Sequence, residues 1–232
     1  MREAIHNILI FDYDGTLTYE STVVPQVTKD ALKKMKDQSL ATLGIISGRD
    51  LPFLQRVDKE LSNVFSFLIA ENGAISYFED LKKKEVLGKD WSSHAREVLA
   101  NSGIPLHFAE IMFATSIEYA PKISEYLSKS RLEAKLVPNK DSLMVLPPDV
   151  DKGTGVARTI QHFGTTRRLF LTCFGDGEND LALFAPADLG VAVSNAVDAL
   201  KQIADVVTER PGGYGVAEYL EETFLIEDRA KD

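Results

Sequence analysis

Short apolar runs alternate along the chain with segments in which apolar residues recur at helical spacing. The runs are rich in Ile, Leu, Val and Phe, which favours buried strands. They lie at 7–12, 41–46, 67–70, 168–174, 189–193 and 205–207. Helices are expected between them, at 26–38, 50–62, 152–163, 179–186 and 196–204. The helix at 152–163 is expected to stop at Gly164. Strands that are apolar throughout and alternate with helices predict an α/β fold, a doubly wound, Rossmann-like parallel sheet covered on both faces.

The stretch 82–149 departs from this alternation. Its pattern predicts a helix near 92–101, a strand near 107–115 and a helix near 119–129, then two β segments, 133–137 and 142–146, joined by a turn. We interpret it as a small α+β cap domain inserted into a core made of 1–81 and 150–232. Such a cap can close over a site and exclude water. The alternative is that it merely extends one continuous domain. The run Lys82-Lys83-Lys84 is interpreted as a solvated turn.

Paired carboxylates follow two of the apolar strands. Asp12 and Asp14 come directly after the first, and Asp176 and Asp180 follow the strand that ends near Phe174. The carboxyl ends of parallel strands meet at one edge, so these groups are expected to form a hard-oxygen site suited to Mg²⁺. Asp12 is then the candidate nucleophile, and Asp14 is close enough to act as general acid and base. A solvent-facing acidic turn and an ordinary strand–helix loop with a capping Asp are the alternatives.

Candidate phosphate-binding groups follow other elements. The Ser47 hydroxyl and the Gly48 amide close the second strand and can donate to a phosphoryl oxygen. Lys152 begins a helix, where its charge lies beside free backbone donors, and Asn179 can hydrogen-bond across the second acidic cluster. In isolation, these residues also fit simple turns and a surface lysine. Arg49 is left open between a substrate contact and a structural ion pair.

Four segments in this order resemble the motifs of the haloacid-dehalogenase-like (HAD) phosphatase superfamily. They are Asp12-Tyr13-Asp14-Gly15-Thr16, Ser47-Gly48, Lys152 and Gly175-Asp176-Gly177-Glu178-Asn179-Asp180. An insertion between the second and third motifs, together with the loop Glu71-Asn72-Gly73-Ala74, is similar to the Cof-type, sugar-phosphatase-like branch. The chain looks most similar to archaeal-type phosphoglycolate phosphatases, although those often carry Asn at the position of Arg49. The segments around Asp12 and Ser47 are instead similar to those of trehalose-phosphate phosphatases.

The resemblance implies a Mg²⁺-dependent phosphomonoester hydrolase that forms an aspartyl-phosphate on Asp12. Its substrate would be a small phosphorylated metabolite, with 2-phosphoglycolate as the first hypothesis and a trehalose-, sucrose- or mannosyl-phosphoglycerate-type sugar phosphate as the second. A phosphomutase and a catalytically silent metabolite-binding module are further alternatives. The implied metal ligands are Asp12, Asp14 through its backbone carbonyl, Asp176 and Asp180, while Ser47 and Lys152 would hold the phosphoryl group.

Composition and charge limit the classes of binding partner and the cellular compartment that this chain fits. The net charge of −9 over 232 residues, without a sustained basic stripe, argues against a nucleic acid or an anionic membrane. The apolar runs are too short to span a membrane, and the N-terminus lacks a signal-peptide pattern. A single cysteine, Cys173, excludes an internal disulfide and fits a reducing cytoplasm. The four histidines share no metal-binding spacing, so each is expected to be structural or on the surface. A homodimer through the cap or a core face is compatible with this sequence.

Overall fold

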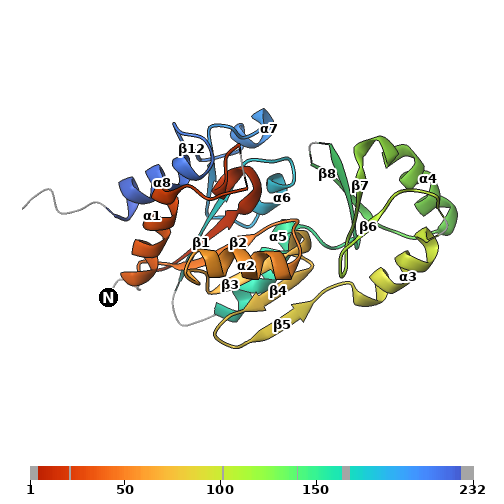
Figure 1. Cartoon of the computed structure of the whole chain (residues 1–232), viewed down its shortest axis with the longest axis horizontal. Coiled ribbons are helices and arrows are strands. Elements are labelled where there is room, and N and C mark those ends of the chain that lie inside the picture. The colour runs from red at the N-terminus through yellow and green to blue at the C-terminus, as the bar shows by residue number, and fades with distance from the viewer. Residues whose placement is uncertain (1–4, 21, 101, 140, 164–167, 226–232) are drawn as a thin grey trace, which may run out of the picture.

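The computed structural model describes residues 5–20, 22–100, 102–139, 141–163 and 168–225. They form two sheets, which Figure 1 shows side by side. The larger sheet has eight strands in the order β12-β11-β10-β1-β2-β3-β4-β5. The strands from β12 to β3 are parallel, and β4 and β5 are added antiparallel at one edge. Their bounds are β1 His6–Asp12, β2 Thr42–Ile46, β3 Phe67–Ala70, β4 Ile75–Phe78, β5 Lys83–Val86, β10 Leu169–Gly175, β11 Leu189–Ala192 and β12 Val206–Val207.

Helices cover both faces of this sheet, as the uniformly apolar strands predict. Alternate residues of β1 point to opposite faces, so that Leu9 and Phe11 pack with one set of helices and Ile8 and Ile10 with the other. The first set is α1 Gln26–Asp37, α2 Leu51–Glu60 and α8 Gly212–Thr223. The second set is α5 Lys152–Ile160, α6 Asp180–Phe184 and α7 Asp198–Lys201. The doubly wound core is therefore confirmed. The expected helix stop at Gly164 lies outside the described residues.

One edge of the large sheet differs from the prediction. Lys83 and Lys84, which were expected in a solvated turn, belong to β5, which pairs with β4. The β5 side chains are exposed or half-buried, so the strand carries no apolar run that sequence patterning could detect. Lysines on an edge strand also discourage pairing with a further chain. β5 is therefore part of the larger sheet. The exact domain boundaries, at 81/82 and 149/150, remain a prediction.

The second sheet belongs to the cap, the name used from here for the elements from α3 to β9. Its strands are all antiparallel, in the order β6-β7-β9-β8. Two helices pack on this sheet through a separate apolar cluster that includes Leu99, Phe113 and Ile123. The bounds are α3 Lys89–Leu99, β6 His107–Phe108, β7 Phe113–Ser116, α4 Ala120–Ser130, β8 Lys135–Asn139 and β9 Ser142–Leu146.

The single strand expected at 107–115 is wrong, because a turn at 109–112 divides it into β6 and β7, which pair antiparallel. The backbone amides of this turn bind a carboxylate from the core, described below, so a distant contact overrides the local apolar pattern. In the part of the chain that the structure describes, no helix is long and apolar enough to cross a membrane.

Candidate active site

The sheet register brings the two acidic segments to one edge. Phe11 of β1 is level with Phe174 of β10, and Asp12 is level with Ile46 of β2. The residues that follow these strands, Ser47 and Asp176, therefore lie beside Asp12 at the carboxyl edge. This is where parallel α/β sheets place their ligands.

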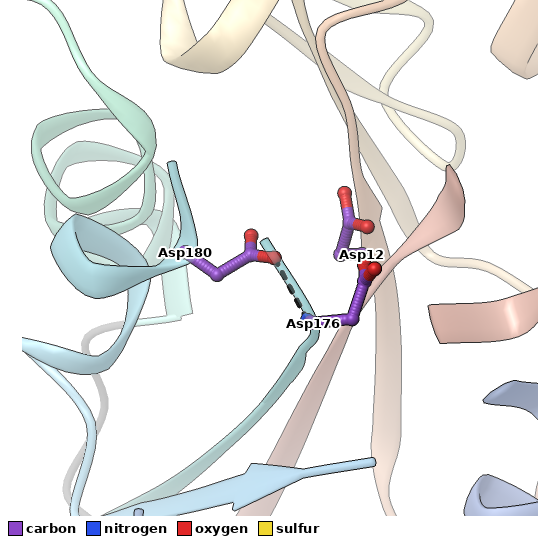
Figure 2. Close-up of side chains that lie close together, drawn as sticks. All are labelled: Asp12, Asp176 and Asp180. Carbon is purple, nitrogen blue, oxygen red and sulfur yellow. Dashed lines mark hydrogen bonds between the residues drawn. The ribbon is translucent and has the colours of Figure 1, made fainter. Parts of the chain in front are cut away.

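Three carboxylates converge at this edge. One oxygen each of Asp12, Asp176 and Asp180 lies within 4.8 Å of the others, and all three residues are buried. Figure 2 shows them reaching toward one another from β1, from the end of β10 and from α6. A cluster with oxygen donors only suits a hard divalent cation. The carboxylate of Asp14 lies outside this cluster.

A buried ammonium group joins two of these carboxylates. Lys152, which is 1% exposed, donates to Asp12 Oδ1 and to Asp180 Oδ1, each at 2.6 Å. Lys152 is the first residue of helix α5, whose start is fixed by a capping box between Asp151 and Thr154. Burial alone would lower the pKa of Lys152, but the two carboxylates raise it, so that the amine stays charged. Burial raises the pKa of Asp12, an effect that Lys152 opposes and the neighbouring carboxylates increase.

Hydrogen bonds also orient the rest of the acidic cluster. Asp180 Oδ2 accepts from the backbone amides of Asp176 and Gly177, at 3.0 and 2.9 Å. Both of its oxygens are thus engaged. The Thr16 hydroxyl donates to Asp176 Oδ1 at 3.1 Å. Gly15 has a φ of +89°, and a Cβ there would lie 2.2 Å from Asp176 Oδ2. The first motif can approach Asp176 this closely only because position 15 is glycine.

Asp14 is held by a contact whose purpose the sequence left open. Arg49 forms a bidentate pair with it, Nε to Oδ2 at 3.1 Å and Nη2 to Oδ1 at 2.8 Å. The Ser47 hydroxyl donates to the same Asp14 Oδ2 at 3.3 Å. The Asp14 side chain is 38% exposed, so it faces the solvent side of the cluster. Arg49 is therefore an ion-pair partner of the candidate acid and base in this structure.

The remaining predicted residues lie on the same edge. Gly48 faces Asn72 and Met144, since a Cβ at position 48 would come within 3.1 Å of Asn72 Nδ2 and 3.2 Å of Met144 Sδ. The amide of Asn179 donates to Asn72 Oδ1 at 3.1 Å. Thus every site residue predicted from the sequence lies at one edge. Sequence reasoning missed the roles of Thr16 and Asn72, and of Asn195, which donates to Gly15 O at 2.9 Å. Only Thr16 and Asn72 lay within segments already noted as motifs.

A cavity of about 570 Å³ lies between this edge and the cap. The core lines it with most of the residues above and with Phe53 and Arg56 of α2. The cap contributes a mixed wall, made of His107, Ala109, Met112, Ala114, Asn139, Asp141, Ser142 and Met144. His107 was expected, like the other histidines, to be structural or on the surface, but it lines this cavity. A larger cavity, of about 820 Å³, lies at the opposite edge near His6, Thr42 and Ser66 and contains none of the acidic cluster.

Comparisons with known proteins agree with this architecture. The chain matches the haloacid dehalogenase-like hydrolase family over residues 9–115 and 105–220. It is 33% identical to "Phosphoglycolate phosphatase 2" of Saccharolobus solfataricus, covering 90% of this chain and 89% of that protein. It is 31% identical to a phosphoglycolate phosphatase of Archaeoglobus fulgidus, covering 90% and 93%.

Solved structures share the whole fold. A haloacid dehalogenase-like hydrolase from Bacteroides thetaiotaomicron superposes with a TM-score of 0.80 at 20% identity, covering 94% of this chain and all of that one. A sugar phosphatase of HAD subclass IIB superposes with a TM-score of 0.70 at 20% identity, covering 93% and 98%. With the match over nearly its full length, this chain belongs to the haloacid dehalogenase-like hydrolase family.

Proposed function

We propose that the protein is a Mg²⁺-dependent phosphomonoester hydrolase that acts on 2-phosphoglycolate through an aspartyl-phosphate. The observation that carries the chemistry is the buried group of Asp12, Lys152, Asp176 and Asp180 at the base of the cavity. A carboxylate can attack a phosphate dianion only if positive charge offsets their repulsion, and this group combines an ammonium with an oxygen site for a cation.

Asp12 and Asp14 divide the reaction between them. A carboxylate oxygen of Asp12 attacks phosphorus, and the bond from phosphorus to the ester oxygen breaks. Asp14 gives its proton to the departing alkoxide and then, as a carboxylate, accepts a proton from water. That water attacks phosphorus, which frees Asp12 and inorganic phosphate. The Ser47 hydroxyl and the Gly48 amide line the same cavity and would hold phosphoryl oxygens beside Lys152.

The residues present fit a metal ion. Asp12 and Asp176 would hold it directly, with the backbone carbonyl of Asp14. Asp180, with both oxygens hydrogen-bonded, would support them from behind or ligate by exchanging its contact with Lys152. A bound Mg²⁺ would neutralise the crowded carboxylates and draw electron density from the phosphoryl oxygens. Asn179, which also lines the cavity, would help to bind the substrate by hydrogen bonding.

The substrate proposal rests on the relatives and on the charge of the cavity. Two relatives above 30% identity are named phosphoglycolate phosphatases. The exposed guanidinium of Arg56 lines the cavity and has no ion-pair partner among the residues that the structure describes. It lies 5.7 Å from the centre of the Phe53 ring, and Arg49 lies 5.1 Å from that centre. A substrate with a carboxylate beyond its phosphate would match this cationic rim.

A sugar phosphate is the second candidate. Asn139, Asp141 and Ser142 line the cap side of the cavity and could bind hydroxyl groups. A volume of about 570 Å³ also leaves room for more than a two-carbon acid.

Phosphate release by the purified protein with Mg²⁺ tests both substrates. The panel contains 2-phosphoglycolate, trehalose- and sucrose-phosphates, mannosyl-phosphoglycerate and hexose phosphates. We expect the highest kcat/KM for 2-phosphoglycolate. A sugar phosphate with a higher value would replace the substrate but keep the mechanism. Transfer of phosphate to a second sugar hydroxyl would indicate a mutase. No turnover with metal bound would overturn the hydrolase proposal and leave the silent binding module.

A further inference from the structure

The loop after β3, residues Glu71-Asn72-Gly73, connects the cap to the catalytic edge. It follows Ala70 directly and forms the short helical turn η2. Glu71 and Asn72 both have a φ of 52°, and Gly73 has a φ of 103°. Three consecutive left-handed residues, the first a glutamate, are costly for a backbone. Such a conformation persists only where surrounding contacts determine it, and here those contacts reach four other segments.

The Glu71 side chain binds the cap. Its carboxylate is 1% exposed and accepts three backbone hydrogen bonds from one turn of the cap. Oε1 accepts from Glu110 N at 3.0 Å, and Oε2 accepts from Ile111 N at 2.8 Å and from Met112 N at 2.9 Å. Amide donors to a buried carboxylate make strong, charge-assisted bonds. The bound turn lies between β6 and β7, where Arg96 also binds the carbonyl of Ala109.

The Asn72 side chain bridges the cap and the fourth motif. Its Oδ1 accepts from Asn179, and its Nδ2 points at the sulfur atoms of Met144 and Met112, at 2.7 and 3.8 Å. Both methionines line the cap side of the cavity. Asn72 is also buried, so solvent does not compete for these contacts.

The backbone of the same loop binds the phosphate-binding segments. Glu71 N donates to Arg49 O, and Asn72 N donates to Ser47 O, each at 3.0 Å. A Cβ on Gly73 would lie 2.1 Å from Asp151 O, immediately before Lys152. The loop therefore touches the turn of Ser47, the start of α5, the Asn179 loop and the cap.

We propose that Glu71 and Asn72 are positioning residues that couple the orientation of the cap to the phosphate-binding turn 47–49. This inference deepens the proposed function, on which its kinetic consequence rests. When the turn 47–49 holds a phosphoryl group, its backbone becomes more rigid. This ordering passes through the 71–72 backbone to the Glu71 carboxylate and from there to the cap turn 109–112. That turn ends at Met112, so the cap side of the cavity is set from the core.

Hydrogen exchange of the full-length protein tests the coupling without knowledge of the substrate. The probe is orthovanadate with Mg²⁺, a phosphate mimic that the core site alone can bind. In the wild type we expect slower exchange at both 47–49 and 110–112 on adding the probe. In Glu71→Gln, whose amide group cannot accept three hydrogen bonds, we expect exchange at 110–112 at least about 10-fold faster without the probe. There the probe should protect 47–49 only.

Glu110→Gln is the matched control, because it removes one charge from the same turn and its side chain contacts Lys84. We expect wild-type exchange in this variant. For the best substrate of the panel, Glu71→Gln should raise KM about 10-fold, while inhibition by vanadate changes less than about threefold. If Glu71 had only a structural role, Glu71→Gln would lower the melting temperature, and KM and vanadate inhibition would change by similar factors.

The outcomes are separable from failure of the proposed function. If the probe fails to protect 47–49 in the wild type, the proposed phosphate-binding function is wrong. The basal exchange of 110–112 in Glu71→Gln still tests whether Glu71 holds the cap turn. Unchanged basal exchange in a folded Glu71→Gln overturns the inference, as does protection of 110–112 by the probe in that variant. Should Glu71→Gln not fold, Asn72→Gly takes its place, because glycine suits the φ of 52° and lacks the side chain that contacts Asn179 and Met144. In that variant the probe should protect 47–49 only, and protection of 110–112 as in the wild type would overturn the inference.

Discussion

The two walls of the cavity differ in how firmly their side chains are held. On the core wall, Asp12, Ser47 and Asp176 are buried, and each is fixed by hydrogen bonds or an ion pair. On the cap wall, Met112 and Met144 are buried, but the polar residues His107, Asp141 and Ser142 are exposed. Groups fixed before the substrate arrives need no reorganisation during the reaction, so the core wall suits bond breaking. The exposed polar residues of the cap wall are suited to selecting the substrate that enters.

The same difference appears in how the walls are built. The core wall gathers residues from the ends of adjacent parallel strands, where the register fixes their separation. The cap wall comes from strands of a separate sheet with a separate apolar core, and three of the hydrogen bonds that join the cap to the core are accepted by Glu71. Changes to the buried residues of the core wall should therefore affect turnover, and changes to the cap wall or to exposed residues such as Arg56 should affect substrate preference.

The largest expected effect comes from the nucleophile. Asp12→Asn should reduce kcat by at least about 10³-fold, because an amide does not attack phosphorus. The fold should survive, since Asn keeps the shape and relieves carboxylate crowding. Initial rates with the best substrate and a thermal melt test this. Near-normal turnover in the folded variant would reject Asp12 as nucleophile.

Removal of metal should have a comparable effect on the wild type. Activity should fall to background in EDTA, because Asp12, Asp176 and Asp180 would then repel the substrate phosphate and one another. Excess Mg²⁺ should restore it, and K⁺ at the same ionic strength should not. Full activity of protein shown to be metal-free by elemental analysis would refute the metal proposal.

A third prediction compares two lysines that both bind aspartates, one of them buried and the other half-exposed. Lys152→Met leaves Asp12 and Asp180 buried without their cation, so we expect a loss of about 3–5 kcal/mol in the free energy of unfolding and loss of turnover. Lys135 of the cap binds Asp151 with a side chain that is 39% exposed. Lys135→Met should cost at most about 1 kcal/mol. Urea unfolding in Mg²⁺-free buffer measures both, and equal losses would contradict the larger cost expected for the buried lysine.

Much of the core wall could be predicted from the sequence for a physical reason. Asp12 and Asp176 follow strands that are apolar throughout, and in a parallel sheet such strand ends must meet at one edge. The pair between Arg49 and Asp14 could not be predicted, because it depends on how two side chains reach across neighbouring strand ends. The local pattern around Arg49 fits either role.

The structure of the cap was harder to predict from the sequence, because it also depends on contacts between distant residues. Its apolar run 107–115 suggests one strand, but the turn within it is held by distant residues, among them the carboxylate of Glu71, 39 residues before Glu110, and the side chain of Arg96. Position 71 carries no local sign of this function. The edge strand β5 was likewise hidden, because its half-exposed, lysine-containing sequence has no apolar run.

The smallest and most specific prediction concerns the rim. If Arg56 binds the carboxylate of 2-phosphoglycolate, Arg56→Gln should raise KM for that substrate about 10-fold, the loss of one charge-assisted hydrogen bond, with little change in kcat. A neutral alkyl phosphate should be hydrolysed as before, because it lacks the second anion. Lys59→Gln removes the same charge from the last turn of α2, outside the cavity, and should leave both substrates unaffected. Equal effects on the two substrates would indicate a general electrostatic contribution to phosphate binding, and the substrate carboxylate would then have to be bound by Arg49 or by the cap wall.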